Sequence, residues 1–413
     1  MIGDCNKSQA VFDPCPSNPV VIEPQGEGLK SKLYINSVTV SAKGTWIVSF
    51  TRAEEIADGT FIHEKIYVRR STDKGRTWGD RIDVYDGRLE GVRQAEMGQL
   101  VVVPHNNRLY QFSIKHTGVR FGRMVYTYSD DDGVTWVGPN GRNSAYNIEV
   151  PGYAVAPKGD SNHLMAKGIV LNNGDFMLPF AVATDPEELG GIEAEVVFMV
   201  CDNIFRESDP TKLSFKFFPE GKHGLKVPRA DGKGSLAHEP NIVQMSDGRL
   251  FCTMRTGRGC IYFSVSSDLG RTWTTPEPLR YCEGGKEVLH PNAPCPLVKL
   301  RSGKYILFHH NNDGTAFGGT DPFCYRVNRR PMYIAVGREL PNAKGQPMIF
   351  TGSRFLMDSD GIPAENFMRT TEISCYSGII EDDGELYLIY GNKWLRVEMV
   401  KLPKEILDDR CLY

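Results

Sequence analysis

Three distant segments of the chain carry side chains suited to nucleophilic chemistry. Glu239 and Arg255 lie sixteen residues apart, Arg329 and Arg330 precede an apolar run, and Tyr376 opens another. A phenol with a pKa near 10 is a weak nucleophile at neutral pH, so it needs a neighbouring carboxylate to take its proton. Arginine offers a planar fork that binds a carboxylate through two hydrogen bonds. Together these residues suit covalent attack on an anionic substrate, because a neutral phenol is not repelled by negative charge.

Each of these residues also has a purely structural interpretation. Glu239 and Arg255 could form a buried ion pair, and Tyr376 could be a packed core residue. Only one of Arg329 and Arg330 is expected to face a binding site. Four histidines lie near the ends of strand-like runs, where an isolated histidine is more often simply hydrogen-bonded than a ligand or base. They are His238, His290, His309 and His310, and we include His238 among the candidate binding residues.

A repeated octapeptide indicates how the chain positions these residues. The pattern S-x-D-x-G-x-T-W, known as the Asp-box, occurs at 71–78, 129–136 and 266–273. Its Asp accepts backbone N–H groups across a tight turn, its Gly supplies a positive φ, and its Trp packs between sheets. Each copy follows a strand-like run, so each is predicted to be a hairpin between the outer strands of a four-stranded blade. We therefore interpret the boxes as scaffold rather than catalytic residues.

A second repeated phrase gives the number of blades. A strand, a turn rich in Asn, Asp and Gly, and a second strand recur six times. The six copies occupy 37–50, 98–112, 168–180, 241–254, 296–309 and 377–390. They predict an all-β, six-bladed β-propeller forming a single domain over residues 1–413, with almost no helix. The last blade has three clear strands, and the segment 18–23 is predicted to supply its fourth strand and close the ring.

These features resemble the sialidase superfamily of BNR-repeat hydrolases over nearly the whole chain. The resemblance depends on the spacing of Glu239 and Arg255, on Arg330 before the strand-like run 331–336, and on the Tyr376-Ser377 pair at the start of the last blade. It implies a retaining glycoside hydrolase in which Tyr376 is the nucleophile and Glu239 is its base. Arg255 and Arg330 would hold the carboxylate of the substrate. Sialidases are an exception to the usual two-carboxylate scheme of glycosidases.

Two positions depart from the sialidase pattern. The family carries an Arg-Ile-Pro triplet on the first inner strand, and Tyr34 stands at the place of its arginine. The acid/base aspartate of the family has no unique match in the loop that precedes the first Asp-box, where Asp58 is our first candidate and Glu64 the second. The other candidates in that loop are Glu54, Glu55 and His63. The expected substrate is therefore a terminal acidic sugar, either sialic acid or a related ulosonic or uronic acid, with Tyr34 among the binding residues.

Two other functions remain open. One is a propeller-fold polysaccharide lyase that acts on uronate-containing glycans, with a histidine or tyrosine as acid and base. His105, His116 and His163 lie on the second and third predicted blades and are candidates for that role. The other is a noncatalytic carbohydrate-binding propeller. A lyase product absorbs in the ultraviolet, a hydrolase releases a reducing or keto sugar, and a binding protein releases nothing.

Composition gives no indication of a nucleic-acid or membrane partner, and the sialidase resemblance implies a glycan as the partner. With 48 Lys and Arg against 51 Asp and Glu, the net charge is −3, which favours neither nucleic acid nor an anionic membrane. We find no run of about 18 apolar residues and no signal peptide, so the chain is expected to be cytoplasmic or a trimmed secreted form. Ten scattered cysteines lack metal-ligand spacing, and cofactor motifs are absent. No metal or cofactor is expected, and the oligomeric state stays open.

Overall fold

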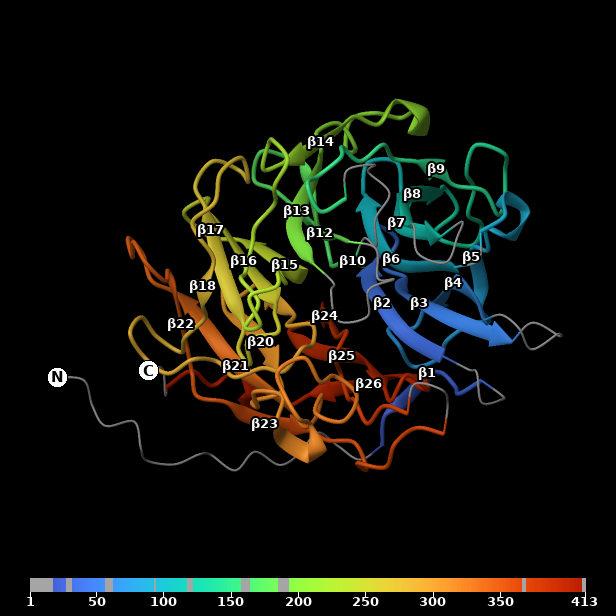
Figure 1. The fold of residues 1–413 in the computed structure, drawn as a ribbon. Coiled ribbons are helices and arrows are strands. Elements are labelled where there is room, and N and C mark those ends of the chain that lie inside the picture. Colours follow the sequence, from blue (N-terminus) through green and yellow to red (C-terminus); the bar gives the residue numbers. More distant parts are fainter. Residues whose placement is uncertain are drawn as a thin grey trace.

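The computed structural model describes residues 18–26, 32–55, 62–92, 94–116, 122–156, 164–184, 193–365 and 369–410. Almost all regular structure in these residues is β-strand, and the sheets are arranged like the blades of a propeller (Figure 1). The helical elements are four short 3-10 turns: η1 (Arg88–Glu90), η2 (Pro210–Lys212), η3 (Ala316–Gly318) and η4 (Lys404–Leu407). No helix within the described ranges has the length and apolar character needed to span a membrane. The predicted all-β, propeller-like arrangement is confirmed.

Residues 32–147 build one sheet of eight strands from two groups. The strands of the first group are β2 (Lys32–Val40), β3 (Trp46–Glu55), β4 (Ile62–Ser71) and β5 (Ile82–Tyr85). Those of the second group are β6 (Gln94–Val103), β7 (Arg108–His116), β8 (Gly122–Ser129) and β9 (Tyr146–Asn147). Pairing is antiparallel inside each group. A single parallel pair, Glu64 with Gln94, joins the two groups.

The remaining strands form four separate sheets. The first contains β10 (Leu164–Met165), β11 (Ile169–Val170), β12 (Phe176–Ala183), β13 (Ala194–Cys201) and β14 (Phe215–Phe218). The second contains β15 (His238–Gln244), β16 (Leu250–Arg255), β17 (Tyr262–Ser266) and β18 (Glu277–Pro278). The third contains β19 (Leu297–Lys299), β20 (Tyr305–His309), β21 (Met332–Glu339), β22 (Met348–Phe350) and β23 (Arg354–Met357). The last contains β24 (Gly378–Asp382), β25 (Glu385–Asn392), β26 (Arg396–Leu402) and β1 (Val20–Glu23).

The observed strand pairing differs from the six separate sheets that six predicted blades would form. The described residues form five hydrogen-bonded sheets, because the pair of Glu64 and Gln94 merges two groups that the sequence repeats predict as separate blades. In the last sheet β1 pairs antiparallel with β26, so the first and last described strands lie side by side (Figure 1).

The three Asp-boxes occupy turns between the outer strands of their sheets. In the second box Asp131 accepts hydrogen bonds from Thr135 N and Oγ1, both at 2.7 Å, and from Ser129 Oγ at 2.8 Å. Gly133 has a φ of 83°, which favours glycine. The ring of Trp136 is buried, and its Nε1 donates to Gly133 O. The same carboxylate contacts recur in the boxes of Asp73 and Asp268.

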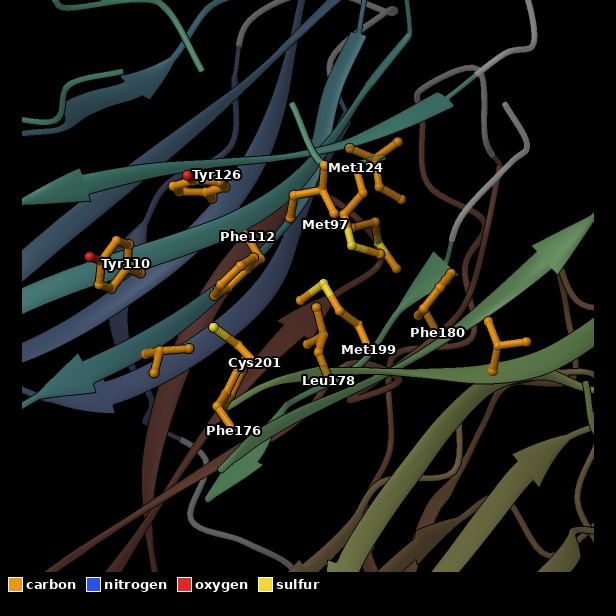
Figure 2. Close-up of a cluster of buried hydrophobic side chains, with 14 of the residues drawn as sticks. Met97, Tyr110, Phe112, Met124, Tyr126, Phe176, Leu178, Phe180, Met199 and Cys201 are labelled. Atoms are coloured by element: carbon orange, nitrogen blue, oxygen red, sulfur yellow. The ribbon is translucent and has the colours of Figure 1, made fainter. Parts of the chain in front are cut away.

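Apolar side chains fill the space between neighbouring sheets. Figure 2 shows one such cluster, in which Met97 of β6, Phe112 of β7, Leu178 of β12 and Met199 of β13 point toward one another. The rings of Phe112 and Phe176 stack with centroids 5.5 Å apart. Because these side chains come from both sheets, they pack the two sheets against each other.

Candidate active site

A cavity of about 250 Å³ lies where the inner strands β2, β6 and β15 converge. Its lining combines charged and aromatic side chains from several sheets. The lining residues are Lys32, Tyr34, Glu96, Met97, His238, Glu239, Arg255, Tyr325, Arg329, Tyr376 and Trp394. Another cavity, of about 280 Å³, lies between β11, β15 and β19, is lined mainly by aliphatic residues and contains none of the predicted site residues.

Tyr376 and Glu239 contact each other in this cavity. The Tyr376 hydroxyl donates to Glu239 Oε1 at 2.6 Å, and Arg255 Nη1 donates to Glu239 Oε2 at 2.6 Å. Glu239 comes from β15, where the pairing with β16 is irregular between His238 and Asn241. Its φ is 37°, in a region that residues with a Cβ rarely adopt. The irregularity aims the Glu239 carboxylate into the cavity, and Arg255, at the end of the paired strand, reaches the same point.

The environment separates the protonation states of the phenol and the carboxylate. Burial, and then the negative charge of Glu239, raise the pKa of Tyr376 well above its ordinary value. Burial alone would raise the pKa of Glu239, but the charges of Arg255 and Arg329 and the hydrogen bond from Tyr376 lower it to about 2. At neutral pH the pair therefore consists of a neutral phenol hydrogen-bonded to an ionised carboxylate. That is the starting state in which a carboxylate can accept the proton of an attacking phenol.

Arg329 lines the cavity, whereas Arg330 points away from it. The Arg329 side chain is 3% exposed; its Nη1 donates to Glu372 Oε2 at 3.0 Å. Its Nε and Nη2 donate to Asn292 O at 3.1 and 2.9 Å. Arg330 instead forms a bidentate pair with Asp358, at 2.8 and 2.6 Å. Arg330, the predicted binding residue, is therefore not among the residues that line the cavity, whereas its neighbour Arg329 is.

Asn292 links the two arginines of the cavity and was not predicted. Its Oδ1 accepts from Arg255 Nε at 2.6 Å, while its main-chain oxygen accepts from Arg329. Asn292 is buried in a loop before β19. Sequence patterns gave no signal for it, since a loop asparagine has many other uses. With Nε and Nη1 of Arg255 engaged, its Nη2 is left without an acceptor among the described residues and is available to a ligand.

A second phenol–carboxylate contact faces the first one. The Tyr34 hydroxyl donates to Glu96 Oε2 at 2.5 Å, and His116 Nε2 lies 3.0 Å from Glu96 Oε1. The rings of Tyr34 and Tyr376 have centroids 5.9 Å apart. Tyr34, a candidate binding residue on the first inner strand, thus lines the cavity. Glu96 was not predicted, because nothing in the sequence of β6 marks the side to which this residue points.

Lys32 brings a further positive charge to the Tyr34 side of the cavity. Its Nζ lies 5.0 Å from the Tyr34 ring centroid and 5.1 Å from that of Trp394. It donates to Glu64 Oε1 at 2.7 Å. The Glu64 side chain, the second candidate for the acid, is 2% exposed and is not among the residues that line the cavity.

The pKa of Glu96 reflects two opposed effects. Burial would raise it, but the hydrogen bond and charge of His116, the charge of Lys32 and the hydrogen bond from Tyr34 lower it below its ordinary value. Burial and the charges of Glu96 and Glu64 raise the pKa of Tyr34 well above its ordinary value. The charge state of the Glu96 carboxylate therefore depends on the groups that surround it.

The remaining predicted residues fall in different places. Asp58 and His163 lie outside the described residues. His238 lines the cavity, and burial, followed by the charge of Arg255, lowers its pKa to about 3, so it is neutral. His105 is exposed in the turn between β6 and β7. Within the part of the chain that the structure describes, no group of three or more His, Cys, Asp or Glu side chains is placed to hold a metal ion.

Comparison with known proteins gives one family and one fold. The family model described as a BNR repeat-like domain matches residues 62–388. A search of curated proteins finds no match. Among solved structures, the Hadza microbial sialidase Hz136 is 17% identical, with a TM-score of 0.61 over 93% of this chain and 68% of its own. A leech intramolecular trans-sialidase is 14% identical, with a TM-score of 0.62 over 95% of this chain and 71% of its own. The NanB sialidase of Streptococcus pneumoniae is 13% identical, with a TM-score of 0.62 over 95% and 72%.

Proposed function

Because this chain belongs to the BNR repeat-like domain family, we propose that it is a sialidase-like glycoside hydrolase that removes a terminal acidic sugar with retention of configuration. One observation carries the proposal. The Tyr376 hydroxyl lies 2.6 Å from a Glu239 carboxylate that Arg255 holds from its other side, within a cavity at the centre of the fold. A phenol adjacent to a carboxylate is an arrangement that activates the phenol as a nucleophile.

The proposed mechanism has two half-reactions. In the first, the Tyr376 oxygen bonds to the anomeric carbon, the glycosidic carbon–oxygen bond breaks, and the phenolic proton moves to Glu239. The departing oxygen takes a proton from a separate acid. In the second, water attacks the anomeric carbon, a base takes its proton, and Tyr376 leaves with the proton that Glu239 returns. Two displacements at the same carbon retain the configuration.

We propose that Arg255 and Arg329 bind the acidic group of the substrate. Both guanidiniums line the cavity, and Asn292 fixes one relative to the other. Nη2 of Arg255 is available for a carboxylate, which arginine binds through parallel N–H groups. Tyr34 stands where a third arginine is expected in a sialidase. The substrate class is therefore an acidic sugar whose carboxylate is held by two arginines, namely a sialic acid, another ulosonic acid or a uronic acid.

The architecture that goes with this proposal is one six-bladed propeller domain. We count the eight-stranded sheet as two blades, because a single residue pair joins its two antiparallel groups. The other four sheets bring the number to six, with β1 as the outer strand of the last blade.

The test is a panel of fluorogenic 4-methylumbelliferyl glycosides of sialic, other ulosonic and uronic acids. We expect the wild-type protein to hydrolyse at least one of them, and Tyr376→Phe and Glu239→Gln to lose about 10³-fold or more in kcat/KM. The losses should not add in the double variant, since both changes disable one unit. Tyr153→Phe is the matched control, because Tyr153 is equally an internal tyrosine, lies in a core cluster and does not line the cavity.

Three results would contradict the proposal. The first is a wild-type protein that cleaves none of the panel. The second is a Tyr376→Phe variant that keeps wild-type turnover on a substrate that the protein does cleave. The third is a product that absorbs in the ultraviolet, which indicates elimination rather than hydrolysis. Proton NMR of the first product formed gives its anomeric configuration directly.

A further inference from the structure

The carboxylates around the cavity fall into two classes by their partners. Three of them are paired with side chains that carry a permanent positive charge. These pairs are Glu64–Lys32 at 2.7 Å, Glu239–Arg255 at 2.6 Å and Glu372–Arg329 at 3.0 Å. Glu96, which also faces the carboxylate of Glu64, is different, because its hydrogen-bond donors are the hydroxyl of Tyr34 and the imidazole of His116. Both of those groups can gain or lose a proton.

This difference bears on which carboxylate can exchange a proton during a reaction. Lysine or arginine at contact distance favours the ionised form of a carboxylate, whereas burial opposes it and raises the pKa of Glu64 and Glu372 above the ordinary value. A carboxylate that contacts an imidazole can share a single proton with it, since either group can carry that proton. His116 is suited to this because its side chain is 5% exposed and its Nε2 faces Glu96 at 3.0 Å. Its Nδ1 has no hydrogen-bond partner among the described residues, so Glu96 is its one side-chain partner there.

Glu96 also lies where an acid is needed. Its side chain is 14% exposed and lines the cavity, whereas Glu64 is 2% exposed and does not. Glu96 accepts from Tyr34, whose ring lies 5.9 Å from the ring of Tyr376. The proposed nucleophile and Glu96 therefore lie on two sides of the same cavity, with Tyr34 between them.

We propose that the Glu96–His116 pair is the proton donor and acceptor for the leaving oxygen, an inference that rests on the function proposed above. In the first half-reaction the glycosidic bond breaks with its electron pair on the departing oxygen, and the proton of the pair moves to that oxygen through Glu96. In the second half-reaction Glu96 takes one proton from the attacking water, which restores the pair. Glu96 is the group that touches the substrate, and His116 and Tyr34 are positioning residues.

The experiment compares two leaving groups on the sugar that the fluorogenic panel identifies. The 4-methylumbelliferyl glycoside releases an acidic phenol that needs little protonation, whereas the methyl glycoside releases an alkoxide that must be protonated. For Glu96→Gln we expect kcat/KM on the methyl glycoside to fall by about 10²- to 10⁴-fold, and on the aryl glycoside by less than about 10-fold. His116→Gln should show the same dependence on leaving group to a smaller degree. If Glu96 had only a structural role, its substitution would lower kcat/KM on both substrates alike.

Two further variants make the result decisive. Glu195→Gln is the matched control, because Glu195 is a buried glutamate 3.3 Å from His223, on β13 and outside the cavity lining. The Glu195→Gln substitution should leave kcat/KM at the wild-type value for both substrates. Asp58→Asn tests the competing carboxylate. If Asp58→Asn shows the leaving-group dependence and Glu96→Gln does not, or if Glu96→Gln slows both substrates equally, the inference is wrong while the proposed function stands. A wild-type protein inactive on the whole panel refutes both.

Discussion

Alanine substitutions at the adjacent residues Arg329 and Arg330 test most directly whether the substrate binds in the cavity that Arg329 lines. Arg329 is buried, and its guanidinium donates to Glu372 and twice to Asn292 O. Arg329→Ala leaves Glu372 buried with its ion-pair partner removed, a change that typically costs about 3–5 kcal/mol. Glu372 keeps a hydrogen bond from Trp394, so we expect the lower end, about 3 kcal/mol.

Arg330→Ala is the natural comparison one residue away. Its pair with Asp358 is partly open to solvent, with side chains 17% and 27% exposed. Such a pair contributes about 1 kcal/mol or less. We therefore expect Arg330→Ala to keep kcat/KM near the wild-type value and Arg329→Ala to lose orders of magnitude. Arg329→Lys should recover part of the stability but little of the activity. Lysine keeps the positive charge but lacks the planar guanidinium that binds a carboxylate through two hydrogen bonds.

Urea unfolding followed by tryptophan fluorescence gives the stability of each variant, and the fluorogenic glycoside gives its activity. Similar losses of stability for both alanine variants would refute the burial argument. Activity lost in Arg330→Ala and kept in Arg329→Ala would return the substrate-binding role to Arg330. It would also mean that the cavity is not the place where the substrate binds.

Three further predictions concern the scaffold, the charge of the proposed base and the link between the arginines. Asp131→Ala should lower the free energy of unfolding by about 1–3 kcal/mol with kcat/KM unchanged, and the opposite pattern would place the Asp-box in the site. The lowered pKa of Glu239, about 2 against an ordinary 4.5, should stabilise the fold by about 3 kcal/mol above pH 4.5 and lose that effect as the pH falls toward 2. Urea unfolding at several pH values should therefore show a steeper acid loss for the wild type than for Glu239→Gln, and parallel curves would contradict it. Asn292→Ala removes the acceptor of Arg255 Nε and should raise KM about 10-fold with a smaller effect on kcat. Asn292→Asp keeps an acceptor and should bind the substrate nearly normally. An unchanged KM in Asn292→Ala would exclude the role of Asn292 in linking the two arginines.

Sequence patterns predicted the residues whose position follows from strand geometry. Glu239 and Arg255 flank one hairpin, so the turn between them brings both to the same end of a sheet. The start of β24 places Tyr376 by the same logic. The repeated hairpins likewise predicted an all-β, propeller-like fold, since their turns and apolar alternation are local features.

The features that sequence patterns did not predict involve positions that no local pattern determines. Arg329 and Arg330 lie in a loop, where alternation along a strand gives no rule for which side chain faces inward. Glu96 and His116 lie on β6 and β7, whose side chains are buried on both faces, so a period of two does not separate the cavity side from the core side. The merging of two blades depends on one residue pair, Glu64 with Gln94. Asp58 lies outside the described residues, and its role stays a prediction.

The pairing of β1 with β26 has a consequence for how the protein folds. Val20 pairs with Met399, so one sheet is built from residues at nearly opposite ends of the described chain. A contact of such sequence separation has a large entropic cost of loop closure and forms slowly. During synthesis the earlier sheets can form while β1 waits for β26 to emerge from the ribosome. We therefore expect the last kinetic phase of refolding to be ring closure, slowed by substitutions in β1 and insensitive to those in the middle sheets.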